Sequence, residues 1–138
     1  MKANVVLGLS AVILLSSCAG TIKGRALAEP KVVEFHDKLA EGKWSEIYEG
    51  AHPEFKNATD EQEFSELLAE VGKRYGERTS HKIVSSKSST LNMDTTVVLV
   101  SRTTFEKGTA LETFTYKLKN GEAALYGYEI NPVSLGLK

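Results

Sequence analysis

The apolar residues of this chain change their period once, at Gly76, and this change limits the fold more than any other feature. Before Gly76 they recur at helical spacing, most clearly at Phe64, Leu67, Leu68, Val71 and Tyr75. After it they alternate as in strands, as far as Ile130. A block of helices followed by a block of strands is typical of an α+β domain, with N-terminal helices packed on one antiparallel sheet.

Three helices are expected before Gly76. The first begins at Pro30 and ends at Gly42, and its apolar stripe is Val32, Phe35, His36 and Leu39. A shorter helix spans 44–51, until His52-Pro53 ends it. The clearest helix runs over 60–75, with Thr59 as N-cap and Gln62 completing a capping box.

Four strands are expected after Gly76, at 81–91, 95–105, 110–119 and 122–130. Asn120-Gly121 predicts a tight type I′ turn, which sets Tyr116 opposite Leu125 and Phe114 opposite Gly127. If Lys107-Gly108 closes the preceding hairpin in the same way, Leu99 lies opposite Tyr116. We expect the helices to cover this face of the sheet.

The opposite face of the sheet is also apolar, which is unusual for the wet side of an antiparallel sheet. It carries Val98, Val100, Leu111, Tyr126, Tyr128 and Ile130. Apolar patches of this kind mark partner surfaces. The pattern predicts a homodimer through the sheet; contact with another protein, or a curved and partly wet sheet, are the alternatives.

The N-terminus has the three parts of a bacterial export signal: Lys2, an apolar run over 5–15, and small residues before Cys18. Leu15-Ser16-Ser17-Cys18 resembles the lipobox of bacterial lipoproteins. The resemblance implies cleavage before Cys18 and fatty acylation of Cys18, which anchors the protein in a membrane. An ordinary secretory signal or a buried N-terminal helix are the alternatives, but Cys18 is the only cysteine and has no disulfide partner.

This interpretation divides the chain into a signal peptide (1–17), a lipidated Cys18 with an irregular tether (18–28) and one domain (29–138). Ala19 stands directly after the lipidated position, where the enterobacterial sorting pattern that it resembles favours the outer membrane, facing the periplasm. We therefore expect a cell-envelope protein.

Charge and composition exclude several functions. The chain has 17 basic and 18 acidic residues, so losing residues 1–17 with Lys2 leaves 16 against 18 and a net charge of about −2. No basic cluster favours nucleic acid. His36, His52 and His81 show no metal-ligand spacing, and no cofactor motif is present in the sequence.

Helices followed by a four-stranded meander, with a last strand of the form Gly-Tyr-x-Ile, resemble the nuclear-transport-factor-2-like (cystatin-like) cone. More narrowly, Trp44-Ser45-Glu46-Ile47-Tyr48, Phe105-Glu106-Lys107-Gly108 and Leu125-Tyr126-Gly127-Tyr128 are similar to the bacterial family called domain of unknown function 4019. The resemblance implies a curved sheet wrapped around helices. Its motifs are packing signatures and imply no chemistry.

The one chemical candidate lies inside the expected cone. With an unbroken register, Glu112 and Glu129 face each other on the helix side, near His36 and Tyr48. Two carboxylates in a half-apolar pocket make an acid–base pair. The alternative is a β-bulge near Gly127, which turns Glu129 outward and relieves the repulsion between like charges.

The sequence thus favours a lipid-anchored envelope domain that binds a protein or small ligand without catalysis. The second candidate function is a small-molecule enzyme, of the isomerase or dehydratase kind, that uses the cone interior. An open polar cavity at Glu112 and Glu129 would favour the enzyme, whereas a filled core would favour the binding domain.

Overall fold

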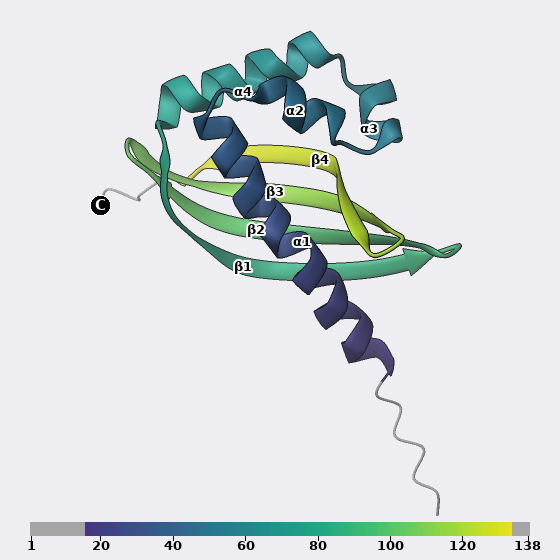
Figure 1. The fold of residues 1–138 in the computed structure, drawn as a ribbon. Helices are drawn as coiled ribbons and strands as arrows, with labels where there is room; N and C mark the ends of the chain where they lie inside the picture. The colour runs from purple at the N-terminus through teal and green to yellow at the C-terminus, as the bar shows by residue number, and fades with distance from the viewer. Residues whose placement is uncertain (1–15, 134–138) are drawn as a thin grey trace, which may run out of the picture.

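The structure is a computed structural model that describes residues 16–133. Over this range, helices come first and strands follow (Figure 1): α1 (Ser16–Ala40), α2 (Trp44–Glu49), α3 (Pro53–Ala58), α4 (Glu61–Tyr75), β1 (Arg78–Leu91), β2 (Asp94–Phe105), β3 (Gly108–Lys119) and β4 (Glu122–Pro132). The predicted α+β class is confirmed. Of the expected signal peptide, residues 1–15 lie outside the described residues.

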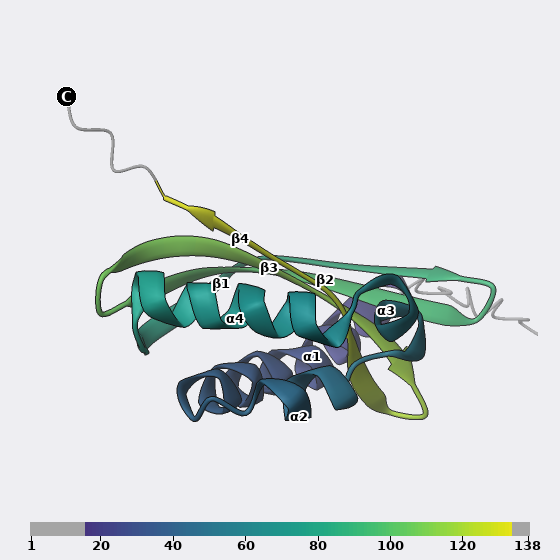
Figure 2. The same ribbon diagram turned by 90° about the horizontal axis from the view of Figure 1, so that it is seen from above.

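The strands form one antiparallel sheet in the order β1-β2-β3-β4. Asn120 and Gly121 have φ values of 53° and 76°, as a type I′ turn requires, so the predicted hairpin is confirmed. The sheet is open and curved, and the helices lie on one side of it (Figure 2). This arrangement is consistent with a cone-like fold.

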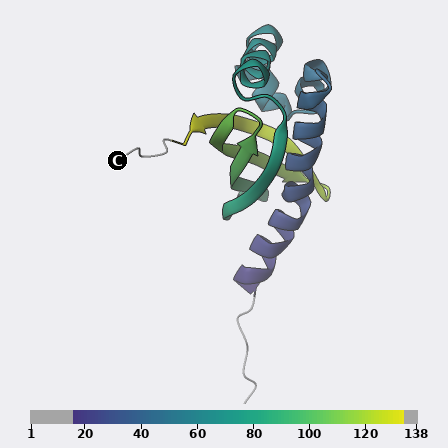
Figure 3. The same ribbon diagram turned by 90° about the vertical axis from the view of Figure 1, so that its left-hand side faces the viewer.

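α1 crosses the sheet and contacts all four strands, while its first turns extend past the sheet (Figure 3). α2 and α4 pack against α1 and each other, and α3 contacts β4. The core between helices and sheet is formed by apolar side chains, the largest of them Phe35, Phe55, Phe64, Leu68, Tyr75, Leu99, Phe105, Phe114 and Tyr116.

The segment 18–28, expected as an irregular tether, is helical and continues α1. This part of the helix packs on the sheet, because the bare Cα of Gly24 lies so close to β2 that an added Cβ would stand 2.9 Å from Val97 Cγ2. Ala28 is also fully buried. Pro30 therefore lies inside the helix instead of opening it. Because proline has no N–H, the carbonyl of Ala26 loses its usual hydrogen bond within the helix. Pro30 and Ala26 are both exposed to water.

Two helix boundaries also differ from the expectation. His52-Pro53, expected only to end a helix, opens α3: Pro53 takes the first helical position and His52 Nδ1 caps the N–H of Glu54 at 3.2 Å. Asp60, not Thr59, caps α4, since Asp60 Oδ1 accepts from the N–H of Gln62 at 2.8 Å. Thr59 is instead the extended residue that ends α3.

The β2–β3 register differs from the expected one by two positions. The turn is Glu106-Lys107, so Val97 lies opposite Tyr116 and Leu99 opposite Phe114. Tertiary contacts hold this turn, because its two N–H groups donate to the carbonyls of Glu77 and Tyr75. A shift of two leaves every side chain on its predicted face, and apolar alternation therefore could not distinguish the two registers.

A β-bulge interrupts the β3–β4 pairing, as the alternative interpretation expected. Tyr116 lies opposite Leu125 but Thr115 lies opposite Gly127, which leaves Tyr126 as the extra residue. Beyond the bulge the faces of β4 are exchanged. Tyr128 now lies opposite Phe114 and Ile130 opposite Glu112, on the helix side.

Candidate functional site

Glu112 is the centre of the only polar cluster that we find buried within residues 22–133. β3 places it on the helix side of the sheet, opposite Ser101 of β2 and Ile130 of β4. The residue is 0% exposed. A carboxylate is rarely buried so completely unless donors surround it, because an isolated buried charge is very costly.

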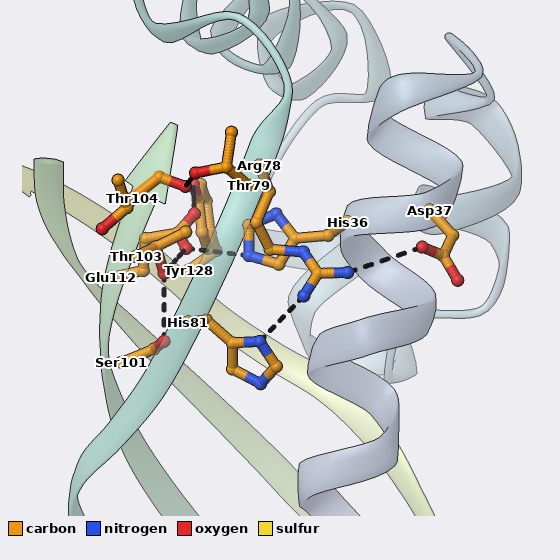
Figure 4. A network of polar contacts seen from close by, with 10 residues as sticks. All are labelled: His36, Asp37, Arg78, Thr79, His81, Ser101, Thr103, Thr104, Glu112 and Tyr128. Atoms are coloured by element: carbon orange, nitrogen blue, oxygen red, sulfur yellow. Dashed lines mark hydrogen bonds and ion pairs between the residues drawn. The ribbon is translucent and has the colours of Figure 1, made fainter. Parts of the chain in front are cut away.

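Three side chains contact the Glu112 carboxylate (Figure 4). Thr103 Oγ1 donates to Oε2 at 2.6 Å, and Tyr128 OH donates to Oε1 at 2.6 Å. His36 Nε2 lies 2.8 Å from Oε2. Ser101 Oγ extends the group, 3.0 Å from Thr103 Oγ1. Protein groups thus engage both carboxylate oxygens.

His36 reaches the carboxylate from α1 and is 3% exposed. Its Nε2 is close to Glu112 Oε2 but is not aligned for a hydrogen bond, and its Nδ1 has no partner in the described part of the chain. The contact is therefore electrostatic, and it is an ion pair only when the ring is protonated.

Tyr128 is held as a hydrogen-bond donor. Burial raises the pKa of its hydroxyl, and the neighbouring charge of Glu112 raises it further. Deprotonation would place two anions side by side in the core. Tyr128 OH therefore stays protonated and donates its hydrogen bond to Glu112 Oε1.

Arg78 forms a separate group of polar contacts nearer the surface (Figure 4). Its guanidinium lies 2.8 Å from His81 Nδ1 and 3.7 Å from Asp37 Oδ1. Burial lowers the pKa of His81, and the positive charge of Arg78 lowers it further. A neutral His81 ring can accept the hydrogen bond that Arg78 donates.

Aromatic rings fill the interior around Glu112. The ring centroids of Phe35 and Phe114 are 5.1 Å apart, and those of Phe114 and Tyr128 are 5.2 Å apart. The ring of Phe105 lies 5.8 Å from that of His36. These are ordinary aromatic packing distances. They leave the carboxylate enclosed.

A pocket of about 170 Å³ lies on the far side of His36, but it does not reach Glu112. Its walls include Arg78, Glu77 and Glu106. Glu112 lines none of five pockets on the described part of the chain. The buried carboxylate is therefore closed off from these five pockets.

Of the four residues predicted to form a pocket, the structure brings two together. Glu112 and His36 are in contact, but the bulge turns Glu129 out into solvent, opposite Thr113, so the expected pair of carboxylates does not form. Tyr48 lies elsewhere. Its OH donates to the carbonyl oxygens of Lys56 at 3.1 Å and Thr59 at 2.8 Å, and thereby holds α3.

The predicted interface residues do not all lie on the outer face of the sheet. Tyr128 and Ile130 face the helices, because the bulge exchanges the faces of β4, and the prediction for these two is wrong. Tyr126, the bulge residue, lies beneath the Lys117 ammonium, 4.4 Å from its ring centroid. Val98 and Val100 keep the outer face and are half-buried. The homodimer stays a prediction, now resting on Val98, Val100 and the adjacent Leu111.

Thr103, Ser101 and Arg78 were not singled out from the sequence. The sequence does contain a signal for Ser101 and Thr103. The core-facing positions of β2 are Val97, Leu99, Ser101, Thr103 and Phe105. Two hydroxyls in an apolar row predict a buried polar partner. Among residues 16–133, no group of three or more His, Cys, Asp or Glu side chains is placed to hold a metal ion.

Neither a protein-family model nor a curated protein matches this chain. In the part of the chain that the structure describes, no helix is both long and apolar enough to cross a membrane.

Proposed function

We propose that this protein is a lipid-anchored domain of the bacterial cell envelope that binds a partner without catalysis. The proposal of binding without catalysis is carried by the surroundings of Glu112, where protein groups occupy both carboxylate oxygens. Thr103 and Tyr128 donate to the carboxylate, His36 lies against it, and aromatic rings enclose it. The proposal of a lipid anchor rests on the resemblance of Leu15-Ser16-Ser17-Cys18 to a lipobox.

An acid–base catalyst must reach a proton on its substrate, at hydrogen-bond distance or through one water. Glu112 is 0% exposed, so it cannot do so without opening the core. Glu129 is accessible, but it stands on the opposite face of the sheet. These positions support a structural role for Glu112, and no observation favours the isomerase-like or dehydratase-like alternative.

The experiment that tests the anchor is metabolic labelling with an alkyne analogue of palmitate in a bacterial host, followed by membrane fractionation. We expect the wild type to be labelled and to stay with the membranes, because acylation occurs on the thiol of Cys18. Cys18→Ser removes that thiol and should abolish the label.

A matched control shows whether labelling requires a thiol at position 18 or only a thiol somewhere in the chain. Cys18→Ser combined with Ser80→Cys keeps one thiol in the chain but moves it to an exposed site in β1. This variant should stay unlabelled. Equal labelling of the wild type and Cys18→Ser, or a wild type that fractionates as a soluble protein, would exclude the lipid anchor.

A further inference from the structure

One end of the domain gathers three segments that are far apart in sequence: residues 22–24 of α1, the β1–β2 turn at 91–94 and the β3–β4 turn at 119–122. We call this the docking end. Gly24 holds it together, since an added Cβ there would stand within 4 Å of Ser88, Val97 and Leu118. Both turns lie at the same end of the sheet (Figure 1), a few residues beyond these contacts, and Thr90, Thr95 and Asn120-Gly121 line one groove with Lys23 and Gly24 of α1.

The docking end exposes the most solvent-accessible apolar side chains of the described residues. Met93 is 95% exposed, Leu91 is 73% exposed and Ile22 is 69% exposed. Single exposed apolar residues are normal on any protein surface. Three large ones at one end are not, and they indicate a surface that is covered in use.

The backbone supports the same interpretation. Asn92 and Met93 have φ values of 50° and 67°, in the left-handed region that glycine adopts most easily. The other turn at this end has Gly121 at the corresponding position. A methionine at such a position is conformationally unfavourable. Its exposed side chain gains no burial energy within the domain that would offset this cost. Binding outside the domain would supply that compensation.

A groove of about 260 Å³ separates α1 from the two turns. Lys23 and Lys119 line it, together with the hydroxyl residues Ser88, Thr90 and Thr95, and its lining contains no carboxylate. Ammonium and hydroxyl groups suit phosphate oxygens. Asp94 and Glu122 lie on the turns beside the groove, so the positive charge is local to the groove and does not extend over the whole end.

We propose that the docking end lies on a lipid bilayer, with Met93, Leu91 and Ile22 entering the interface and the lysine groove holding anionic phospholipid head groups. The proposal rests on the proposed anchor at Cys18. Cys18 precedes Gly24 in the same helix, and a rise of 1.5 Å per residue places the two backbones only about 9 Å apart along the axis. Apolar side chains of interfacial proteins enter about 5–10 Å, which is compatible with this separation.

The test uses the full-length chain, purified with its lipid and reconstituted in vesicles. Cys18 is the only cysteine, so once it is acylated Met93→Cys supplies a single free thiol for a nitroxide label. Lys107→Cys is the matched control, because Lys107 is exposed in the β2–β3 turn at the other end of the sheet. Membrane depth is measured for both labels by relaxation with oxygen and with a water-soluble nickel complex.

We expect the label at position 93 to lie below the phosphate level in vesicles of phosphatidylcholine and phosphatidylglycerol, and the label at 107 to stay in water. Lys23→Gln with Lys119→Gln should return the first label toward water. Vesicles without phosphatidylglycerol should do the same, whereas free inorganic phosphate should not compete. Equal water exposure of the two labels in anionic vesicles would overturn the proposal.

Flotation of the vesicles separates this proposal from the proposed function. A wild type that floats while both labels stay in water keeps the anchor and removes the docking surface. A wild type that does not float removes the anchor and the docking surface with it.

Discussion

Glu112 and Thr103 are fully buried, and Tyr128 packs against the same core. A buried charged group is weak evidence for stability, because desolvation offsets much of its attraction. Thr103 reaches Glu112 diagonally, because Ser101 lies directly opposite Glu112. The register expected from the sequence would have set Thr103 itself opposite Glu112, so this hydrogen bond does not distinguish the two pairings. The contacts that do are those of the Glu106-Lys107 turn with the carbonyls of Glu77 and Tyr75.

We expect Glu112→Gln to destabilise the protein by about 2–4 kcal/mol, because the amide cannot replace a charge that two hydroxyls and an imidazole surround. Glu129→Gln is the matched control. It makes the same change on the solvent side of the same hairpin and should cost less than about 0.5 kcal/mol. Urea unfolding followed by circular dichroism measures both, and equal losses would contradict a structural role for Glu112.

At the scale of single elements, two adjacent residues end one helix and begin the next. Asp60 caps α4, while Thr59 directly before it ends α3. Thr59 and Asp60 are both good cap residues, and sequence spacing alone favoured Thr59 because Gln62 stands three positions on. The presence of α3 changed the outcome, since Thr59 N–H donates to the carbonyl of Phe55 at 2.9 Å.

Asp60→Ala should therefore lower the free energy of unfolding by about 1 kcal/mol, through loss of the bonds to the N–H groups of Gln62 and Glu63. Thr59→Ala removes a cap residue type at the adjacent position and should change it by less than about 0.5 kcal/mol. Chemical denaturation of the two variants side by side compares them. A larger loss in Thr59→Ala would restore the cap that the sequence pattern favoured.

At the scale of the whole molecule, α1 joins Cys18, the proposed lipid anchor, to the core. The expected irregular tether would let an anchored domain move some tens of ångströms from the membrane. A continuous helix that packs on the sheet from Gly24 onward would hold such a domain close and limit its orientation. Docking of one end on the bilayer follows from this geometry more directly than it would from a flexible link.

The stability of the whole molecule should fall steeply above pH 10. Burial is the main cause that raises the pKa values of Tyr116 and Tyr128 above the ordinary value of 10.0. Above that pH the unfolded chain releases two protons that the folded chain retains, so each tyrosine lowers the free energy of unfolding by about 1.4 kcal/mol per pH unit. Below pH 10 neither contributes a slope.

Tyr116→Phe is the variant that checks this prediction. Tyr116 OH has no hydrogen-bond partner among residues 16–133, so its removal should cost little at pH 7 and roughly halve the alkaline slope. Urea titrations between pH 8 and pH 11 give the slope directly. An unchanged slope in Tyr116→Phe would show that other groups dominate alkaline unfolding.

The amino-acid sequence by itself determined the α+β class, the order of strands and the face of the core residues in β2 and β3. It could do so because apolar period and turn chemistry are local properties. Val97, Leu99 and Phe114 therefore lie where alternation predicts. Asn120-Gly121 needed no tertiary contact to form its turn.

Only the tertiary structure decided the contents of the candidate site. One extra residue at Tyr126 exchanged the faces of β4, sending Glu129 to solvent and bringing Tyr128 to Glu112. A bulge depends on how two strands and the helices above them pack, so the sequence offered it near Gly127 only as an alternative to the unbroken register. The segment expected as a tether is likewise helical and packs on the sheet, with Gly24 close against Val97. Each outcome depends on contacts between residues distant in sequence, which local preference does not record.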